Sequence, residues 1–172
     1  MFSQTSLTLA HNVITLANQH NIKIITAESC TSGLVAATLT AIPGASTCVE
    51  GGVITYSNQL KQDYLGVLEN SIIQYGAVSE QVAQEMALGA LANKTSKYLS
   101  ISVTGIAGPG GGTKNKPVGT VCFAIGHQNN IIISKRQCFN TVFQKDGREG
   151  VRSESVKYCL QEIISYLKSL SL

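Results

Sequence analysis

Residues 22–34 read IKIITAESCTSGL. The apolar and β-branched residues at the start predict a short buried strand, and the Leu, Val and Ala residues from position 34 onward have helical spacing. Ser29 therefore lies where a strand ends and a helix begins. We expect its side chain to face the end of a sheet, where the first free backbone N–H groups of the helix point outward toward an anion or a developing oxyanion.

Several interpretations of this polar cluster are open. Ser29 or Thr31 caps the helix, which is the commoner role of such residues, or Ser29 is a hydroxyl nucleophile. Cys30 competes with it, because a thiol at a helix N-terminus has a lowered pKa, but no histidine stands nearby to pair with it. Glu28 is expected to orient or cap the turn, and a role in holding a lysine is a further alternative.

The composition indicates one soluble domain spanning residues 1–172. Hydrophobic residues make up 44% of the chain and charged residues 13%, which is typical of a compact protein and not of a disordered one. The formal charge of +3 is spread along the chain without a basic run. It gives little support for a nucleic-acid partner and is compatible with a small anionic ligand.

Five cysteines stand at positions 30, 48, 122, 138 and 159, without Cys-x-x-Cys spacing and without clustering with histidines. This pattern favours neither a disulfide framework nor a structural zinc site. The first ten residues do not resemble a secretion signal, and no apolar run approaches the length needed to span a membrane. We therefore expect a cytoplasmic protein with no membrane partner.

Helices and strands alternate over the first two thirds of the chain, and a hairpin follows. This order predicts an α/β fold, a three-layer α/β/α sandwich with a mixed sheet of about five strands. After the strand and helix around Ser29, the pattern predicts strands over 49–56, 98–104, 118–125 and 131–139, and helices over 7–17, 58–65, from 79 onward, and about 146–170.

None of the three histidines, at positions 11, 20 and 127, stands near Ser29 in the sequence or at a strand end that would face it. A Ser-His-Asp triad is therefore disfavoured. Tyr56 and Lys61 offer another base, because their segment also leaves a strand and enters a helix. If the two strands are adjacent and parallel, both residues lie near the same sheet edge as Ser29.

A lysine that is partly removed from water can lose its proton near neutral pH and activate a serine. Tyr56 would then relay a proton or donate one to the leaving group. Spacing alone leaves the alternative open that Lys61 is solvated on a short helix and Tyr56 half-buried at a strand end.

The glycine-rich segment 105–112 reads GIAGPGGG, which is neither a Walker loop nor a dinucleotide-binding fingerprint. Its backbone N–H groups could bind a phosphate or a carboxylate, or the segment is a flexible connection. Arg148 and Arg152 are candidate phosphate partners because guanidinium binds such groups in a bidentate manner, although ordinary surface arginines are commoner.

Together these segments resemble the CinA C-terminal domain family, which also occurs as stand-alone nicotinamide-nucleotide amidases of the PncC type. The resemblance extends from about residue 7 to 168. The matching motifs are TAESCT (26–31), GVITYSN (52–58) with Lys61, GAVS (76–79), and VTGIAGPGG (103–111) followed by KPVGT (116–120).

The resemblance implies hydrolysis of the carboxamide of nicotinamide mononucleotide to nicotinic acid mononucleotide and ammonia. It implies Ser29 as nucleophile, Lys61 as general base, and Tyr56 as a helper in protonating ammonia. It requires no metal and no cofactor, and it suggests a small-molecule nucleotide as partner and a homodimer. Residues expected to bind the substrate are Cys30, Thr31, Thr104, Gly105 and Arg148.

The chain departs from the family pattern at two places. Ser32-Gly33 replaces the usual Gly-Gly, and FQKDGR at 143–148 is one residue longer than the usual Phe-x-Gly-Asp-Arg, with Gly and Asp exchanged. These departures leave a second hypothesis open, in which the chain is a catalytically silent nucleotide-binding or regulatory module. A third hypothesis is a cysteine hydrolase that uses Cys30.

Overall fold

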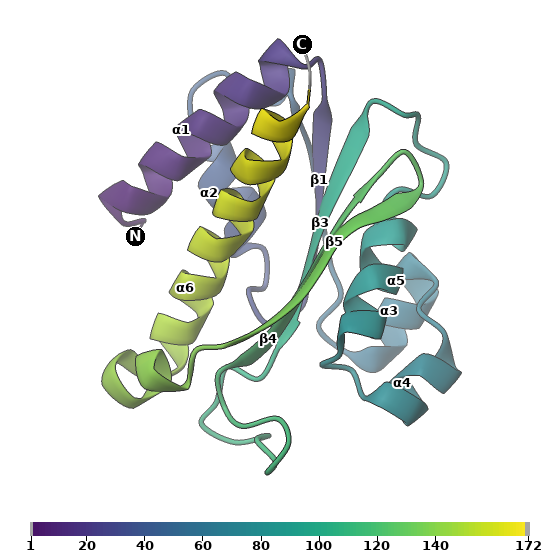
Figure 1. The fold of residues 1–172 in the computed structure, drawn as a ribbon, viewed down its shortest axis with the longest axis vertical. Coiled ribbons are helices and arrows are strands. Elements are labelled where there is room, and N and C mark those ends of the chain that lie inside the picture. Colours follow the sequence, from purple (N-terminus) through teal and green to yellow (C-terminus); the bar gives the residue numbers. More distant parts are fainter. Residues whose placement is uncertain (1, 171–172) are drawn as a thin grey trace.

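The computed structural model describes residues 2–170, which form a central five-stranded sheet with helices on both faces (Figure 1). The predicted α/β/α sandwich with a mixed five-stranded sheet is confirmed. The elements are α1 (Gln4–Gln19), β1 (Lys23–Glu28), α2 (Leu34–Thr40), the 3-10 helix η1 (Ala45–Thr47), β2 (Val49–Ile54), α3 (Asn58–Leu65), α4 (Glu69–Tyr75), α5 (Glu80–Ala90), β3 (Tyr98–Gly105), β4 (Thr120–His127), β5 (Asn130–Cys138) and α6 (Asn140–Ser169).

The strand order in the sheet is β2-β1-β3-β4-β5. Strand β1 pairs in parallel with both β2 and β3, whereas β4 pairs antiparallel with β3 and with β5. The carboxyl ends of β1, β2 and β3 therefore meet at one edge, at the lower end of Figure 1. Ser29, Tyr56 and Gly105 follow or end these three strands, so the parallel arrangement expected from the sequence places them at one edge.

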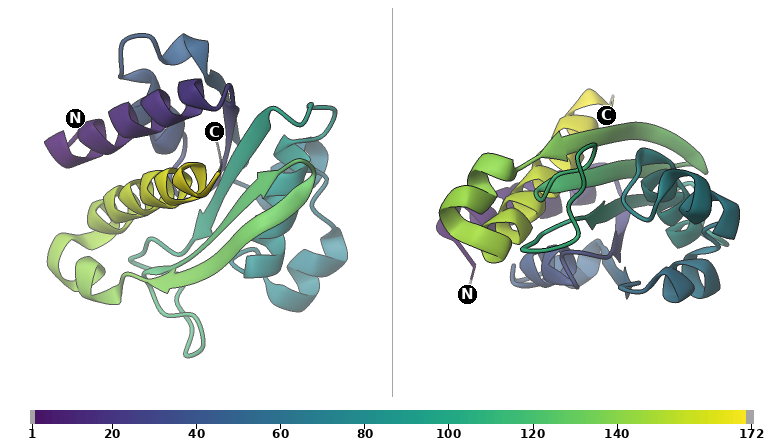
Figure 2. Two further views of the ribbon diagram at one scale, coloured as in Figure 1. Left: turned by 45° about the horizontal axis from the view of Figure 1, so that its top comes forward. Right: turned by 90° about the horizontal axis from the view of Figure 1, so that it is seen from below.

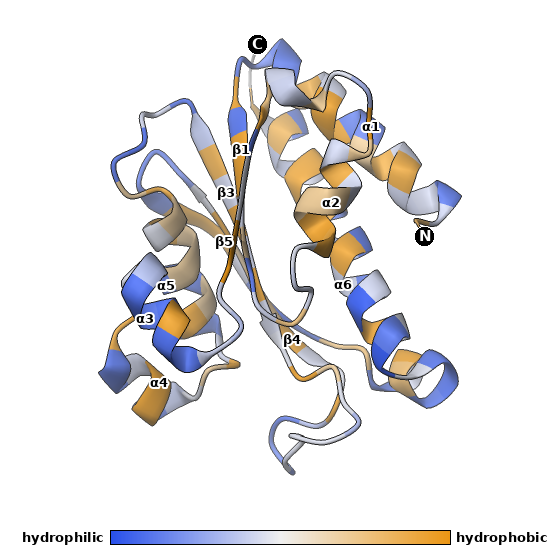
Figure 3. Cartoon of the chain, turned by 180° about the vertical axis from the view of Figure 1, so that it is seen from behind, coloured by the Kyte–Doolittle hydropathy of each residue, from blue (hydrophilic) through white to orange (hydrophobic). Residues whose placement is uncertain are grey.

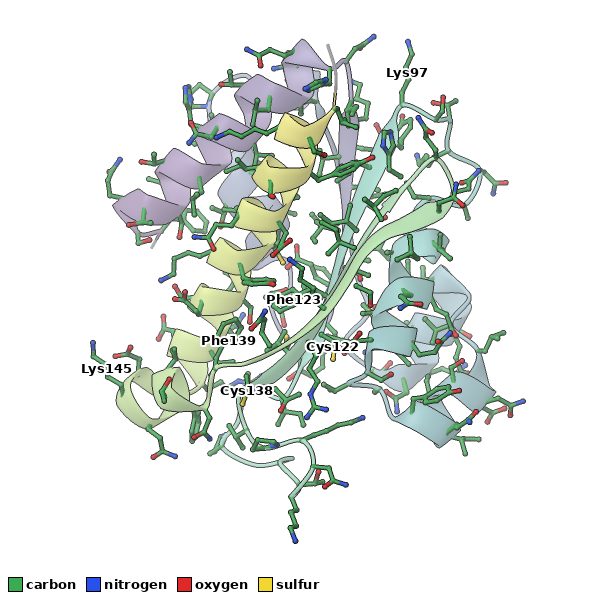
Figure 4. The ribbon with its side chains drawn as sticks, in the orientation of Figure 1. Lys97, Cys122, Phe123, Cys138, Phe139 and Lys145 are labelled. Carbon is green, nitrogen blue, oxygen red and sulfur yellow. The ribbon has the colours of Figure 1, made fainter. Side chains whose placement is uncertain are left out.

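Helices α1, α2 and α6 cover one face of the sheet, and α3, α4 and α5 cover the other (Figures 1 and 2). Apolar residues, orange in Figure 3, gather between the sheet and these helices. Figure 4 labels two neighbours on β4 that serve opposite layers: Phe123 packs in the core under α6, and Cys122 packs with Ala83 and Ala87 of α5. This alternation buries both faces of β4, as expected for a central strand.

The sequence pattern missed α4. Of its residues only Ser71 is buried, while Ile73 is 74% exposed, so its apolar residues do not form a buried stripe. The residue before the helix, Leu68, makes no side-chain cap hydrogen bond. Neither the periodicity nor the capping signal that identifies a helix is therefore present.

The last helix begins earlier than predicted, at Asn140, and is interrupted at Gly147, whose φ of 64° lies in the left-handed region. A glycine adopts that conformation without the steric cost of a Cβ atom. The predicted hairpin is confirmed, with a two-residue turn at Gln128 and Asn129 whose φ angles are 53° and 59°.

Among residues 2–170, no helix is long and apolar enough to cross a membrane, and no group of three or more His, Cys, Asp or Glu side chains could hold a metal ion. All five cysteines are free thiols.

Gly89 provides a test of the packing between α3 and α5. A Cβ atom at this position would lie well inside van der Waals contact with the carbonyl group of Leu65. We expect Gly89→Ala to lower the free energy of unfolding by about 1–3 kcal/mol, although alanine is the better helix former. Urea unfolding measures this, with Gly110→Ala as control because Gly110 has open space around it. Equal destabilisation of both variants would contradict the packing argument.

Candidate active site

The structure brings Ser29 and Lys61 into direct contact. The Lys61 Nζ atom lies 2.9 Å from Ser29 Oγ, and both side chains are buried, with exposed fractions of 1% for Lys61 and 8% for Ser29. The cap of α3 explains this placement. Ser57 accepts a hydrogen bond from the N–H of Leu60, which begins the helix so that Lys61 projects inward.

The surroundings of Lys61 favour its neutral form. Burial lowers the pKa of its amine from 10.5 to about 8. Nζ also lies 2.8 Å from the carbonyl oxygen of Thr55 and 3.4 Å from that of Tyr56, and no carboxylate in the described part of the chain pairs with it. In the neutral amine, two N–H bonds can serve these carbonyls, which leaves the lone pair for the Ser29 hydroxyl proton. This is the geometry of a serine with a lysine base.

Glu28 caps α2 and does not hold Lys61. Its buried carboxylate accepts hydrogen bonds from Thr26 Oγ1 at 3.0 Å and Thr31 Oγ1 at 2.7 Å. It also accepts from the backbone N–H groups of residues 33, 35 and 36, at 2.9, 3.1 and 2.9 Å. The expectation that the first N–H groups of the helix point outward to an oxyanion is therefore wrong, because Glu28 already binds them.

The structure contradicts the argument for Cys30 as nucleophile. The thiol is buried, and this burial, together with the charge of Glu28, raises its pKa to about 12. The thiolate, which is the reactive form, is thus absent near neutral pH. The expected lowering of the pKa at a helix N-terminus is outweighed here, because burial raises the pKa of the thiol by more than the backbone N–H of Cys30 lowers it, and the charge of Glu28 adds to the rise.

A cavity of about 180 Å³ opens above Ser29 and Lys61. It is lined by ten residues from all three parallel strand ends, from the loop before α5 and from α6, and it contains no histidine. Three hollows elsewhere on the described residues are larger, about 280, 420 and 470 Å³, but none of these contains the Ser29–Lys61 pair. The lining residues are Ser29, Cys30, Tyr56, Asn58, Lys61, Ala77, Val78, Thr104, Gly105 and Arg148.

Three of these lining residues, Asn58, Ala77 and Val78, were not singled out as site residues by the sequence reasoning. They lie in the motifs at 52–58 and 76–79, so the motifs themselves carried the signal. The hydroxyl of Thr104 donates to the carbonyl of Ala77 at 2.9 Å. This bond fixes the loop before α5 against the end of β3.

Arg148 reaches the cavity across two neighbouring segments. Its Nη1 donates to the carbonyl of Gly108 at 2.8 Å, and its Nη2 to the hydroxyl of Tyr56 at 2.9 Å. The altered motif at 143–148, with its turn at Gly147, therefore still places the Arg148 side chain at the cavity. Arg152 is different: it does not line the cavity, and its guanidinium binds backbone carbonyls, so it is not a phosphate partner in this arrangement.

Thr31 also lies outside the cavity lining. Its buried hydroxyl donates to Glu28, so the side chain supports the turn and does not face a substrate. The unusual Ser32 adopts a φ of 53° and Gly33 a φ of 89°. Both are values that glycine adopts most easily, so the serine keeps the turn of the motif at some steric cost.

The family description "CinA C-terminal domain" matches residues 6–167. The chain belongs to the CinA C-terminal domain family. Among curated relatives, it is 45% identical over 140 residues to the nicotinamide-nucleotide amidohydrolase PncC of Escherichia coli K12, covering 81% of each chain. It is 51% identical over 130 residues to a CinA-like protein of Colwellia psychrerythraea, covering 76% of this chain and 29% of that protein.

Solved structures of this family have the same fold. The competence/damage inducible protein CihA of Agrobacterium tumefaciens superposes with a TM-score of 0.89 at 38% identity, covering 98% of this chain and 99% of that chain. A competence damage-inducible protein of Klebsiella pneumoniae gives a TM-score of 0.87 at 32% identity, covering 96% and 99%.

The buried amine of Lys61 should make stability depend on pH. Its pKa is lowered on folding, so between about pH 8 and 10.5 the unfolded chain binds more protons, and the folded state becomes more stable as the pH rises. We expect the free energy of unfolding of Lys61→Met to compare best with that of wild type near pH 7. The difference between the two free energies should move in favour of wild type by roughly 3 kcal/mol at most as the pH rises toward 10.

Urea unfolding of both proteins across this range measures the difference. A gap between the two unfolding free energies that stays constant with pH would contradict the buried-amine argument.

Proposed function

We propose that the protein hydrolyses the carboxamide of nicotinamide mononucleotide to nicotinic acid mononucleotide and ammonia, through a serine acyl-enzyme. The observation that carries the proposal is the 2.9 Å contact between Ser29 Oγ and the buried amine of Lys61. The 45% identity to an amidohydrolase with that substrate class in its name supports the choice of substrate.

In the first half of the reaction, Ser29 Oγ attacks the amide carbon while its proton passes to Lys61 Nζ. The carbonyl π electrons move onto oxygen and form a tetrahedral oxyanion. When the oxyanion collapses, the C–N bond breaks and the amide nitrogen takes the proton from Lys61, so ammonia leaves. In the second half, Lys61 accepts a proton from the water that attacks the acyl carbon. It returns this proton to Ser29 Oγ as the acyl C–O bond breaks and the acid product leaves.

Tyr56 and Arg148 stand at the mouth of the cavity. Tyr56 is 58% exposed and its hydroxyl accepts from Arg148, so its O–H can donate a hydrogen bond to the departing nitrogen while Lys61 supplies the proton. Arg148 supplies a positive charge for the phosphate of a mononucleotide.

The cavity is smaller than the 300–1,000 Å³ or so of ordinary small-molecule pockets. We therefore propose that it holds the pyridine carboxamide and that the ribose phosphate extends over the rim toward Arg148.

Ammonia release from nicotinamide mononucleotide tests the proposal. We expect Ser29→Ala to abolish turnover and Lys61→Ala to lower kcat at least about 10³-fold, because each removes a reacting group. Cys30→Ser should keep activity because the buried thiol takes no part. A wild-type protein that binds the nucleotide but releases no ammonia would contradict the proposal and leave the silent binding module. Loss of activity in Cys30→Ser with retention in Ser29→Ala would favour the cysteine hydrolase.

The pH profile should report the lysine. Only the neutral amine can accept the serine proton, so kcat/KM is expected to be low at about pH 6 and to rise to a plateau above the Lys61 pKa of about 8. A steady-state pH series measures this. A profile that is flat across this range, or one that falls as the pH rises toward 9, would show that Lys61 is not the base.

A further inference from the structure

Arg152 of α6 holds the turn that carries Ser29. Its Nε donates to the carbonyl oxygen of Cys30 at 3.1 Å, and its Nη2 donates to that of Thr31 at 3.1 Å. One planar guanidinium thus binds the two consecutive peptide groups that follow Cys30. Because Arg152 does not line the cavity, it holds both carbonyls on the side of the turn that faces α6.

This contact also sets the direction of the backbone N–H groups. The C=O and N–H of a trans peptide point in opposite directions, so a Cys30 carbonyl held toward α6 turns the Thr31 N–H away from it. The Ser29 carbonyl accepts the N–H of Ser32 at 3.1 Å, which in the same way orients the Cys30 N–H. Within residues 2–170, the N–H groups of Cys30 and Thr31 have no acceptor.

The neighbouring donors are already in use. The N–H of Ser29 donates to the carbonyl of Val103, and the N–H groups at the start of α2 donate to Glu28. Of the two unused N–H groups, that of Cys30 belongs to a residue that lines the cavity, whereas Thr31 is fully buried and lies outside the lining. A backbone donor beside a nucleophile can stabilise a tetrahedral oxyanion.

We propose that Arg152 is a positioning residue for this oxyanion site. It keeps the Cys30 carbonyl oxygen turned away from the cavity, so that the oxygen on which negative charge develops meets the Cys30 N–H and not a carbonyl oxygen. Without Arg152, the peptide between Cys30 and Thr31 is free to rotate and to present its carbonyl oxygen, which would repel the oxyanion. The inference rests on the proposed amidase function for its natural substrate, but the same site serves any group that Ser29 attacks.

A fluorophosphonate probe tests the inference without the natural substrate. Ser29 Oγ forms a bond to phosphorus, the P–F bond breaks, fluoride leaves, and the serine proton passes to Lys61. The phosphoryl oxygen gains negative charge in the transition state, so labelling depends on the oxyanion donors. The rate of Ser29 labelling is measured by mass spectrometry for wild type, Arg152→Ala, Arg152→Lys and Ser29→Ala.

We expect Arg152→Ala to label about 10- to 100-fold more slowly than wild type, and guanidinium at low, non-denaturing concentration to restore part of the rate. Ammonium should not restore it. Arg152→Lys keeps the charge but cannot span both carbonyls with a rigid fork, so it should also be slow. If Arg152→Ala does not fold, the labelling rate of Arg152→Lys tests the positioning role in its place.

Arg136→Met is the matched control, because Arg136 also donates to a backbone carbonyl, that of Asn115, but outside the cavity. It should label at the wild-type rate. With nicotinamide mononucleotide as substrate, Arg152→Ala should lower kcat by about the same factor as it lowers the labelling rate. KM should change less than about threefold, because the lost interaction forms only in the transition state.

The outcomes separate the two proposals. Slow labelling of folded Arg152 variants, with no ammonia release by wild type, would refute the amidase function and leave the positioning role in place. Wild-type labelling rates in Arg152→Ala and Arg152→Lys would overturn the positioning role whatever the substrate. A wild-type Ser29 that the probe does not label would overturn both.

Discussion

The removal of one amine from water is the constraint on which the site depends. Lys61 is 1% exposed, and its partners within hydrogen-bond distance are uncharged: Ser29 Oγ and the carbonyls of Thr55 and Tyr56. Burying a protonated amine in such a place opposes folding, and a nearby carboxylate would relieve this cost but would also keep the proton on the lysine. The structure leaves the cost in place, which makes the amine a base near neutral pH.

The single buried carboxylate nearby is used for a different purpose. Glu28 accepts two hydroxyl and three backbone hydrogen bonds, which together fix the chain between β1 and α2. Its charge contributes to keeping the thiol of Cys30 protonated. The neighbouring Ser29 instead contacts the lysine. Burial and charge therefore favour the hydroxyl of Ser29 over the thiol of Cys30 as the nucleophile that we propose for this turn.

The sequence was sufficient for the features that depend on local pattern. The strand before Ser29, the strand before Tyr56 and the hairpin at 126–130 all show hydrophobic periodicity or turn residues, and their order predicted the sheet. Local pattern could not show that the N–H groups at the start of α2 bind Glu28. It also could not show that Arg152 binds the carbonyls of Cys30 and Thr31, which lie 122 and 121 residues before it, because this contact depends on how α6 packs against the turn. Helix α4 was missed for a related reason, since its apolar residues are not its buried ones.

The two arginines of α6 have a consequence for the order in which the protein becomes competent. Ser29 and Lys61 are both synthesised by position 61, whereas Arg148 and Arg152 follow only after β5. A ribosome would thus have to synthesise the chain through position 152 before Arg148 could border the cavity and Arg152 could bind the serine turn. A nascent or C-terminally shortened chain that lacks residues 148–152 would carry Ser29 and Lys61 without the two arginines that contact the serine turn and line the cavity.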